Sequence, residues 1–188
     1  MHHARIAAVC DKRTHVRMNS PFVPHSGLPF VPHPAPDELL GSWLLRVAQL
    51  YGLGLATLMS RLGARPAGDA HLPHWFAIGG DTVSLDALSA AARLPRVDLA
   101  AMAPTGCRPR WPEELGACQK CLAHETDAGQ PITWRRAWMN PLATVGSIHG
   151  AWLTPVATRT LARVRHAGDL DEVVECDQPI RWSCDQAW

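Results

Sequence analysis

A close pair of cysteines and a distant histidine are the residues of this chain whose types and spacing could bind a metal. Cys118 and Cys121 are separated by two residues, and His149 follows about thirty residues later in Ser-Ile-His-Gly. Thiolates and imidazoles are ligands that zinc prefers, and a structural zinc site takes four ligands in a tetrahedron. A second ligand pair usually has a similarly close spacing, but its expected first member is Gly146 here. The pattern therefore predicts structural zinc as the cofactor, with three ligands and a fourth still to be found.

Two residues are candidates for the fourth ligand. His124 lies three residues after Cys121, and Cys107 lies in the segment before the cysteine pair. A third alternative is that no metal binds and that aromatic packing holds this part of the chain together. Losing one thiolate weakens a structural site without emptying it, so we expect zinc to be retained.

The cysteine pair has a second chemical interpretation, as a thiol redox motif. In such enzymes the first cysteine is activated at a helix N-terminus, usually within a strand–helix–strand unit. The segment Arg108–Gly116 is rich in Pro, Trp and Glu, and we expect no strand to lead into Cys118. A redox protein is therefore the weaker alternative, and we expect no enzymatic activity.

Composition limits the other functions of the chain. It has 188 residues, a hydrophobic content of 47% and a net charge of +1. This charge excludes a protein that coats nucleic acid by counterion release, so any contact with DNA should be local. No secretory signal and no apolar run of membrane-spanning length is evident, which predicts a cytoplasmic protein with reduced thiols and no membrane contact.

The sequence divides into four parts, and the expected fold class is mainly α. An N-terminal helix-turn-helix-like helical region should be followed by a small irregular zinc-finger-like module. The expected parts are an extended Pro/His-rich arm that docks or stays loose (1–36), the helix-turn-helix-like domain (37–103), the zinc-finger-like module (104–157), and a C-terminal helix with a tail (158–188). The C-terminal helix is expected over Thr158–His166.

Within the helical domain, two helices joined by a glycine turn are predicted. Apolar residues recur at three- and four-residue spacings from Leu39 to Tyr51, Gly52-Leu53-Gly54 breaks the pattern, and a second apolar face ends near Gly63. This is the helix-turn-helix pattern, although a plain helical hairpin packed on a core gives the same periodicity.

A further helical pair is expected after a Gly/Pro/His-rich loop. Ser84 is a suitable N-cap for a helix over Leu85–Arg93. The short segment that follows should bury Val97, Leu99 and Met102. In the preceding loop, His74-Trp75-Phe76 should act as an apolar plug on the helices.

Four segments in this order resemble the TniQ family over roughly residues 28–156. They are Phe30-Val31-Pro32-His33-Pro34 leading into Asp37–Ala48, then Cys118-Gln119-Lys120-Cys121-Leu122, then Trp134-Arg135, and finally Gly146–Leu153. The chain departs from the family pattern at three positions of the metal motifs. Gln119 and Ser147 replace prolines, and Gly146 replaces a cysteine.

The resemblance implies a function that composition could not indicate. TniQ proteins are accessory and target-selection factors of mobile elements, and they combine a helix-turn-helix region with zinc-finger modules. They have no catalytic centre of their own. In CRISPR-associated transposons they connect the effector–guide RNA complex to the AAA+ ATPase regulator. The expected function is therefore a non-catalytic adaptor in DNA transposition, whose partners are that ATPase, a CRISPR effector–guide RNA complex and, indirectly, target DNA.

Four arginines are the candidates for contact with a phosphate group or a partner protein. Arg61 and Arg65 lie near the end of the second helix, and Arg135 and Arg136 lie between the metal motifs. For Arg135, stacking on a neighbouring tryptophan is an equally open alternative.

A DNA-binding transcriptional regulator with a helix-turn-helix and a zinc module is the main functional alternative. Its second helix should be rich in side chains that read base edges. The segment Gly54–Gly63 offers only Thr57, Ser60 and Arg61 for this purpose. This composition favours contact with protein or with the DNA backbone over sequence readout.

Overall fold

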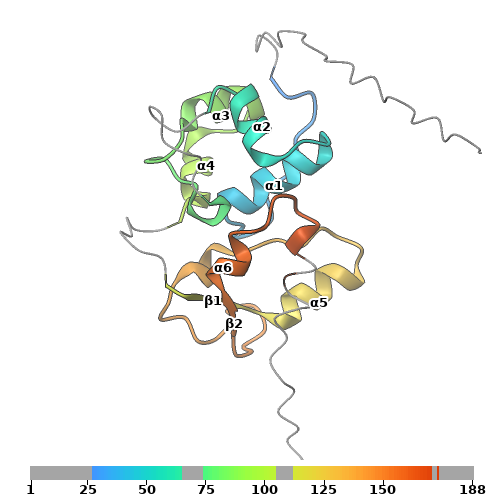
Figure 1. Cartoon of the computed structure of the whole chain (residues 1–188), viewed down its shortest axis with the longest axis vertical. Helices are drawn as coiled ribbons and strands as arrows, with labels where there is room; N and C mark the ends of the chain where they lie inside the picture. The colour runs from blue at the N-terminus through green and yellow to red at the C-terminus, as the bar shows by residue number, and fades with distance from the viewer. Residues whose placement is uncertain (1–26, 65–73, 105–111, 171–172, 174–188) are drawn as a thin grey trace, which may run out of the picture.

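The structure is a computed structural model that describes residues 27–64, 74–104, 112–170 and 173. As predicted, helices dominate the described residues (Figure 1). The elements are α1 (Leu40–Leu50), α2 (Leu55–Arg61), the 3-10 helix η1 (Trp75–Ala77), α3 (Leu85–Ala92), α4 (Arg96–Met102), β1 (Glu114–Ala117), α5 (Gln119–Asp127), the 3-10 helix η2 (Arg136–Met139), β2 (Thr154–Ala157) and α6 (Thr158–Leu161).

The predicted helical hairpin is present as α1 and α2. Trp43 and Leu44 of α1 are buried, as the apolar spacing predicts. Gly52 has a φ of 61°, a left-handed conformation that glycine adopts without strain, and it turns the chain toward α2. With only seven residues, α2 is about two turns long.

The loop after α2 returns to cover α1. Trp75 and Phe76 of η1 are buried against the core, as predicted for the plug, whereas its third member, His74, is exposed. Gly41 of α1 lies against the backbone of Trp75, and a Cβ at this position would overlap the Trp75 carbonyl group. The close approach of α1 and η1 therefore requires glycine here.

The second helical pair agrees with the sequence except at one residue. The Ser84 hydroxyl accepts a hydrogen bond from the backbone N–H of Ala87 at 3.3 Å, so the predicted N-cap is confirmed. Leu99 of α4 is buried, but Val97 is 70% exposed. The prediction for Val97 was wrong because residues two positions apart in a helix point to nearly opposite sides.

A two-stranded antiparallel sheet was not predicted. β1 pairs with β2, with Leu115 opposite Val156 and Ala117 opposite Thr154. Leu115, Ala117 and Val156 are buried. The chain then enters α6, which ends at Leu161 and is shorter than the helix expected to His166.

The helical part and the sheet part share one hydrophobic core. The backbone N–H of Leu39 donates to the Trp134 carbonyl at 2.8 Å. The backbone N–H of Trp134 donates to the Ser42 hydroxyl at 2.9 Å, and the Trp75 indole N–H donates to the Leu161 carbonyl at 2.8 Å. These bonds join the two lobes of Figure 1 across a continuous seam.

The described end of the N-terminal arm docks along α1. The Trp43 indole donates to the Pro32 carbonyl at 2.9 Å, and the Tyr51 hydroxyl donates to the Phe30 carbonyl at 2.6 Å. Of the two states considered for the arm, residues 27–36 adopt the docked one.

Candidate metal centre

The cysteine pair and the distant histidine meet in the folded chain. The Sγ of Cys121 lies 3.2 Å from the His149 Nδ1, and the Sγ of Cys118 lies 3.7 Å from the same nitrogen. The three ligand atoms all lie within 4.8 Å of one another. Zinc bonds of about 2.0 to 2.3 Å in a tetrahedron require ligand separations of roughly 3.5 Å, so this donor set fits the metal.

Two elements present the thiols. Cys118 follows β1 directly and is the N-cap residue of α5, while Cys121 lies in the first turn of that helix. Both cysteines are buried. The strand and the helix therefore fix their side chains on one side of the site.

A turn in the segment after η2 presents the imidazole. We call residues 140–153 the histidine loop. Within it, an antiparallel bridge between Val145 and Trp152 closes the turn, and the N–H of Gly146 donates to the Ala151 carbonyl at 2.7 Å. His149 is exposed at the tip of this turn. A metal bound here would join the histidine loop to the β1–α5 junction.

The TniQ family model matches residues 29–153. The chain belongs to the TniQ family. It is therefore a transposition-associated protein. No curated protein and no solved structure matches the chain.

The position of the missing TniQ cysteine lies beside the site. A Cβ at Gly146 would be 3.2 Å from the Cys118 Sγ. The backbone thus places this residue where the TniQ motif has its other thiolate, although the glycine has no side chain to donate. Gly146 thus lies beside the three candidate ligands without adding a fourth.

Of the two candidates for the fourth ligand, the structure describes His124 but not Cys107. Among these residues, the cluster of possible ligand atoms comprises Cys118, Cys121 and His149, without His124. His124 is exposed in the last turn of α5. Cys107 lies outside the described residues, so its role stays a prediction.

The surroundings of Cys121, the second cysteine of the pair, disfavour ionisation of its thiol. Burial raises the pKa of the Cys121 thiol to about 11, and the neighbouring Cys118 adds to the shift while Arg135 opposes it. Reactive thiols have a lowered pKa. One part of the sequence argument was wrong, because β1 does lead into Cys118. However, β1 pairs antiparallel with β2 and does not form a strand–helix–strand unit of parallel strands.

Arg135, predicted to contact a phosphate group or a partner, is bound within its own chain. Its guanidinium is 2.7 Å from a carboxylate oxygen of Glu125, and its side chain is 12% exposed. It also donates to the Pro36 carbonyl, while Glu125 accepts from the backbone N–H of Thr133. Reversing this charge would break these contacts before it affected any partner.

The other three candidate arginines differ in their surroundings. Arg136 is 3.2 Å from a carboxylate oxygen of Asp37 and donates to the Ala101 carbonyl at 2.6 Å. Arg61 is exposed in the last turn of α2, as predicted. Arg65 lies outside the described residues. Of the four, Arg61 has the described surroundings that best suit contact with another molecule.

Buried ion pairs are the feature that the sequence interpretation missed. Glu38, which is fully buried, is 2.7 Å from the Arg46 guanidinium and accepts a further bond from the Ala35 N–H at 2.8 Å. Burial raises the pKa of the Glu38 carboxyl, and Arg46 opposes this shift. The signal in the sequence was only an acidic residue next to a helix start, which is more often exposed.

Proposed function

We propose that this TniQ-family chain is a non-catalytic adaptor that links a target-recognition complex, or target DNA, to the AAA+ ATPase regulator of its transposon. A CRISPR effector–guide RNA complex is one such target-recognition complex. The observation that carries the proposal is the family match, which runs from the docked arm through the helical hairpin to the histidine loop. The match covers both the helical hairpin and the histidine loop, and one hydrophobic core joins the helical part to the sheet part.

We further propose that Cys118, Cys121 and His149 hold a zinc ion and form a zinc-finger-like module. The support is that the two thiol sulfurs lie 3.7 and 3.2 Å from the imidazole Nδ1, with all three ligand atoms within 4.8 Å of one another. When bound, zinc would supply a cross-link between the histidine loop and the start of α5. The residues of this module would then form a rigid surface to which a partner protein could bind.

Contact with DNA should pass through the partner. The exposed side of α2 carries Thr57, Ser60 and Arg61, which is a poor set for reading bases. With a net charge of +1, the chain cannot supply the many phosphate contacts that tight independent binding needs. This favours an adaptor over a transcriptional regulator.

Pull-down against the AAA+ ATPase encoded beside this gene, with and without duplex DNA, tests the proposal. We expect the ATPase to retain the chain, DNA held by the ATPase to strengthen the complex, and free duplex to bind weakly. Arg61→Glu should weaken the complex in a salt-dependent way. Arg96→Glu is the matched control, because Arg96 is also an exposed helix arginine but lies on α4. Tight, sequence-specific DNA binding without any ATPase interaction would instead support the regulator.

A further inference from the structure

The metal centre lies beside an unfilled space. A cavity of about 180 Å³ is lined by Cys121, Gly146, Ser147 and Ile148, by Ala137 and Trp138 of η2, and on its other side by Pro36, Asp37 and Arg135. It therefore lies next to one of the three ligands and next to the position that a fourth ligand occupies in the TniQ motif. Pockets for whole small molecules have volumes of about 300 to 1,000 Å³, so this one suits a single side chain.

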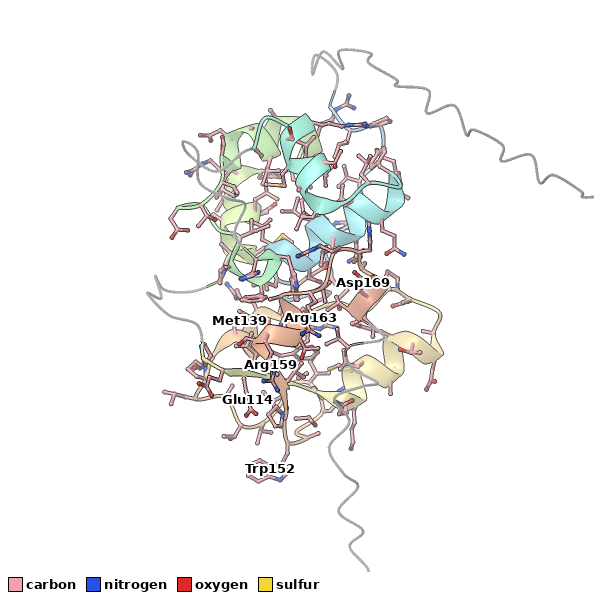
Figure 2. The ribbon with its side chains drawn as sticks, viewed as in Figure 1. Glu114, Met139, Trp152, Arg159, Arg163 and Asp169 are labelled. Atoms are coloured by element: carbon pink, nitrogen blue, oxygen red, sulfur yellow. The ribbon has the colours of Figure 1, made fainter. Side chains whose placement is uncertain are left out.

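The histidine loop also carries most of the exposed large apolar side chains in the described residues. Four of the seven such residues form what we call the apolar rim: Leu142, Val145, Ile148 and Trp152. Trp152 is 77% exposed, and Figure 2 shows it projecting from the end of the molecule farthest from the helical lobe. Ile148 lines the cavity, and Val145 pairs with Trp152 across the loop. The rim thus reaches the candidate metal centre through Ile148.

The charge pattern around the rim indicates which kind of molecule would cover it. No Asp, Glu, Lys or Arg occurs from Ala137 to Thr158. Nucleic acid is bound through cationic side chains, and this segment supplies none. Apolar side chains at the centre of a contact, with few charges, are typical of protein interfaces.

We propose that this centre has an open fourth coordination position, which takes a thiolate or imidazole side chain from a protein partner docked on the apolar rim. The inference rests on the proposed zinc site and specifies how that site takes part in partner binding. The position is open because residue 146 is a glycine. A cysteine at this position would supply the fourth ligand from within the chain. A thiol partner would lose its proton on binding, as thiolate ligands do.

Cobalt spectroscopy of the full chain tests the open position. The Co²⁺-loaded protein is titrated without oxygen with imidazole and with 2-mercaptoethanol, and the visible d–d bands are followed. We expect a saturable change with each probe, one ligand per metal. Gly146→Cys should remove the response. Gly168→Cys is the control, since it also adds a cysteine but lies at a position with no neighbouring atoms.

The failures of the two proposals are distinguishable. If no cobalt binds to the folded protein, the zinc site fails and this inference with it. If cobalt binds with tetrahedral bands that neither probe changes, the zinc site stands and the open position is overturned. A response that appears only after Cys107→Ser would show that the chain closes its own site, which also overturns the proposal.

Short peptides test the source of the ligand. We compare capped Leu-Cys-Leu and Ser-Cys-Ser peptides on the Co²⁺-loaded chain. The apolar peptide should bind about tenfold more tightly, because its leucines bury surface on the rim. Trp152→Ser should remove this preference while leaving the response to 2-mercaptoethanol unchanged. Equal affinities of the two peptides for the original chain would overturn the docking part and indicate a small free thiol as the ligand.

Discussion

The helical lobe and the histidine loop differ in how much of their apolar surface is buried. Eight of the eleven residues of α1 are buried, and the helix is packed by η1 and α2 around Trp43. The histidine loop, by contrast, exposes Leu142 and Trp152 and leads into β2, a strand of four residues. A large core can hold a lobe by itself, whereas a loop with so little buried apolar surface needs a cross-link. The difference indicates that any metal acts locally.

Ion pairs and hydrogen bonds hold the seam between the two parts. Glu38 and Arg46 on one side, and Glu125 and Arg135 on the other, form buried ion pairs at 2.7 Å. The Ser42 hydroxyl joins them by donating to Glu38 and accepting from Trp134. We therefore expect core, seam and loop to respond differently to substitution.

The largest effect is expected in the helical core. Trp43→Ala should lower the free energy of unfolding by about 3 to 5 kcal/mol, because it leaves a cavity and frees the Pro32 carbonyl. Urea unfolding with and without a chelator measures this. The loss should be the same in both conditions, and Val97→Ala, at an exposed site, should change stability by less than about 0.5 kcal/mol. A chelator-dependent loss would contradict the separation of the two regions.

Breaking the seam should have a comparable cost. Glu38→Ala leaves the Arg46 charge buried without its partner, and such truncations cost about 3 to 5 kcal/mol. The control is Asp86→Ala, which breaks the exposed pair with Arg96 and should cost less than about 1 kcal/mol. Similar losses in the free energy of unfolding for the two variants would show that the buried pair does not stabilise the seam as we infer.

Removal of metal should have a smaller and local effect. After chelation, amide hydrogen exchange should accelerate in the histidine loop and at β2, while amides of α1 stay protected. Cys118→Ser should reproduce this pattern without chelator, because it removes one of the three ligands. Unfolding of the whole chain on chelation would mean that the helical lobe depends on the metal too.

The pH dependence of the metal-free chain should be the mildest effect. The Cys121 pKa is raised to about 11 from 9.0, so the folded state keeps this proton longer than the unfolded state does. The corresponding stabilisation is present below pH 9 and is lost as the pH rises through 11. Alkylation of Cys121, followed by peptide mass spectrometry, should accelerate steeply between these values. An inflection below pH 8 would support the redox alternative.

Local signals in the sequence predicted much of the helical lobe. The apolar spacing of α1, the glycine turn and the Ser84 cap each depend on a few neighbouring residues. The sheet was missed because each strand has four residues and its partner lies about forty residues away. Such short strands form only when tertiary packing supports them, and local propensity does not reveal this.

The sequence predicted the candidate ligand residues of the site. It did not predict the side-chain contacts around them. The spacing of the cysteines and the TniQ motif located Cys118, Cys121 and His149, which the fold brings together. The internal pairing of Arg135 with Glu125 could not be inferred, because it joins α5 to the segment before η2. An arginine near a metal motif suggested an exposed cation, whereas the fold buries it.

Zinc content is the measurement that tests the central claim most directly. Protein purified without added chelator should contain close to one zinc per chain by elemental analysis, and Cys118→Ser should contain much less. Cys121→Ser and His149→Ala should show the same loss, while His124→Ala, outside the ligand cluster, should keep its zinc. Less than about 0.2 equivalents in the folded, unaltered chain would contradict the account, because a site with a working tetrahedral donor set retains its metal on purification.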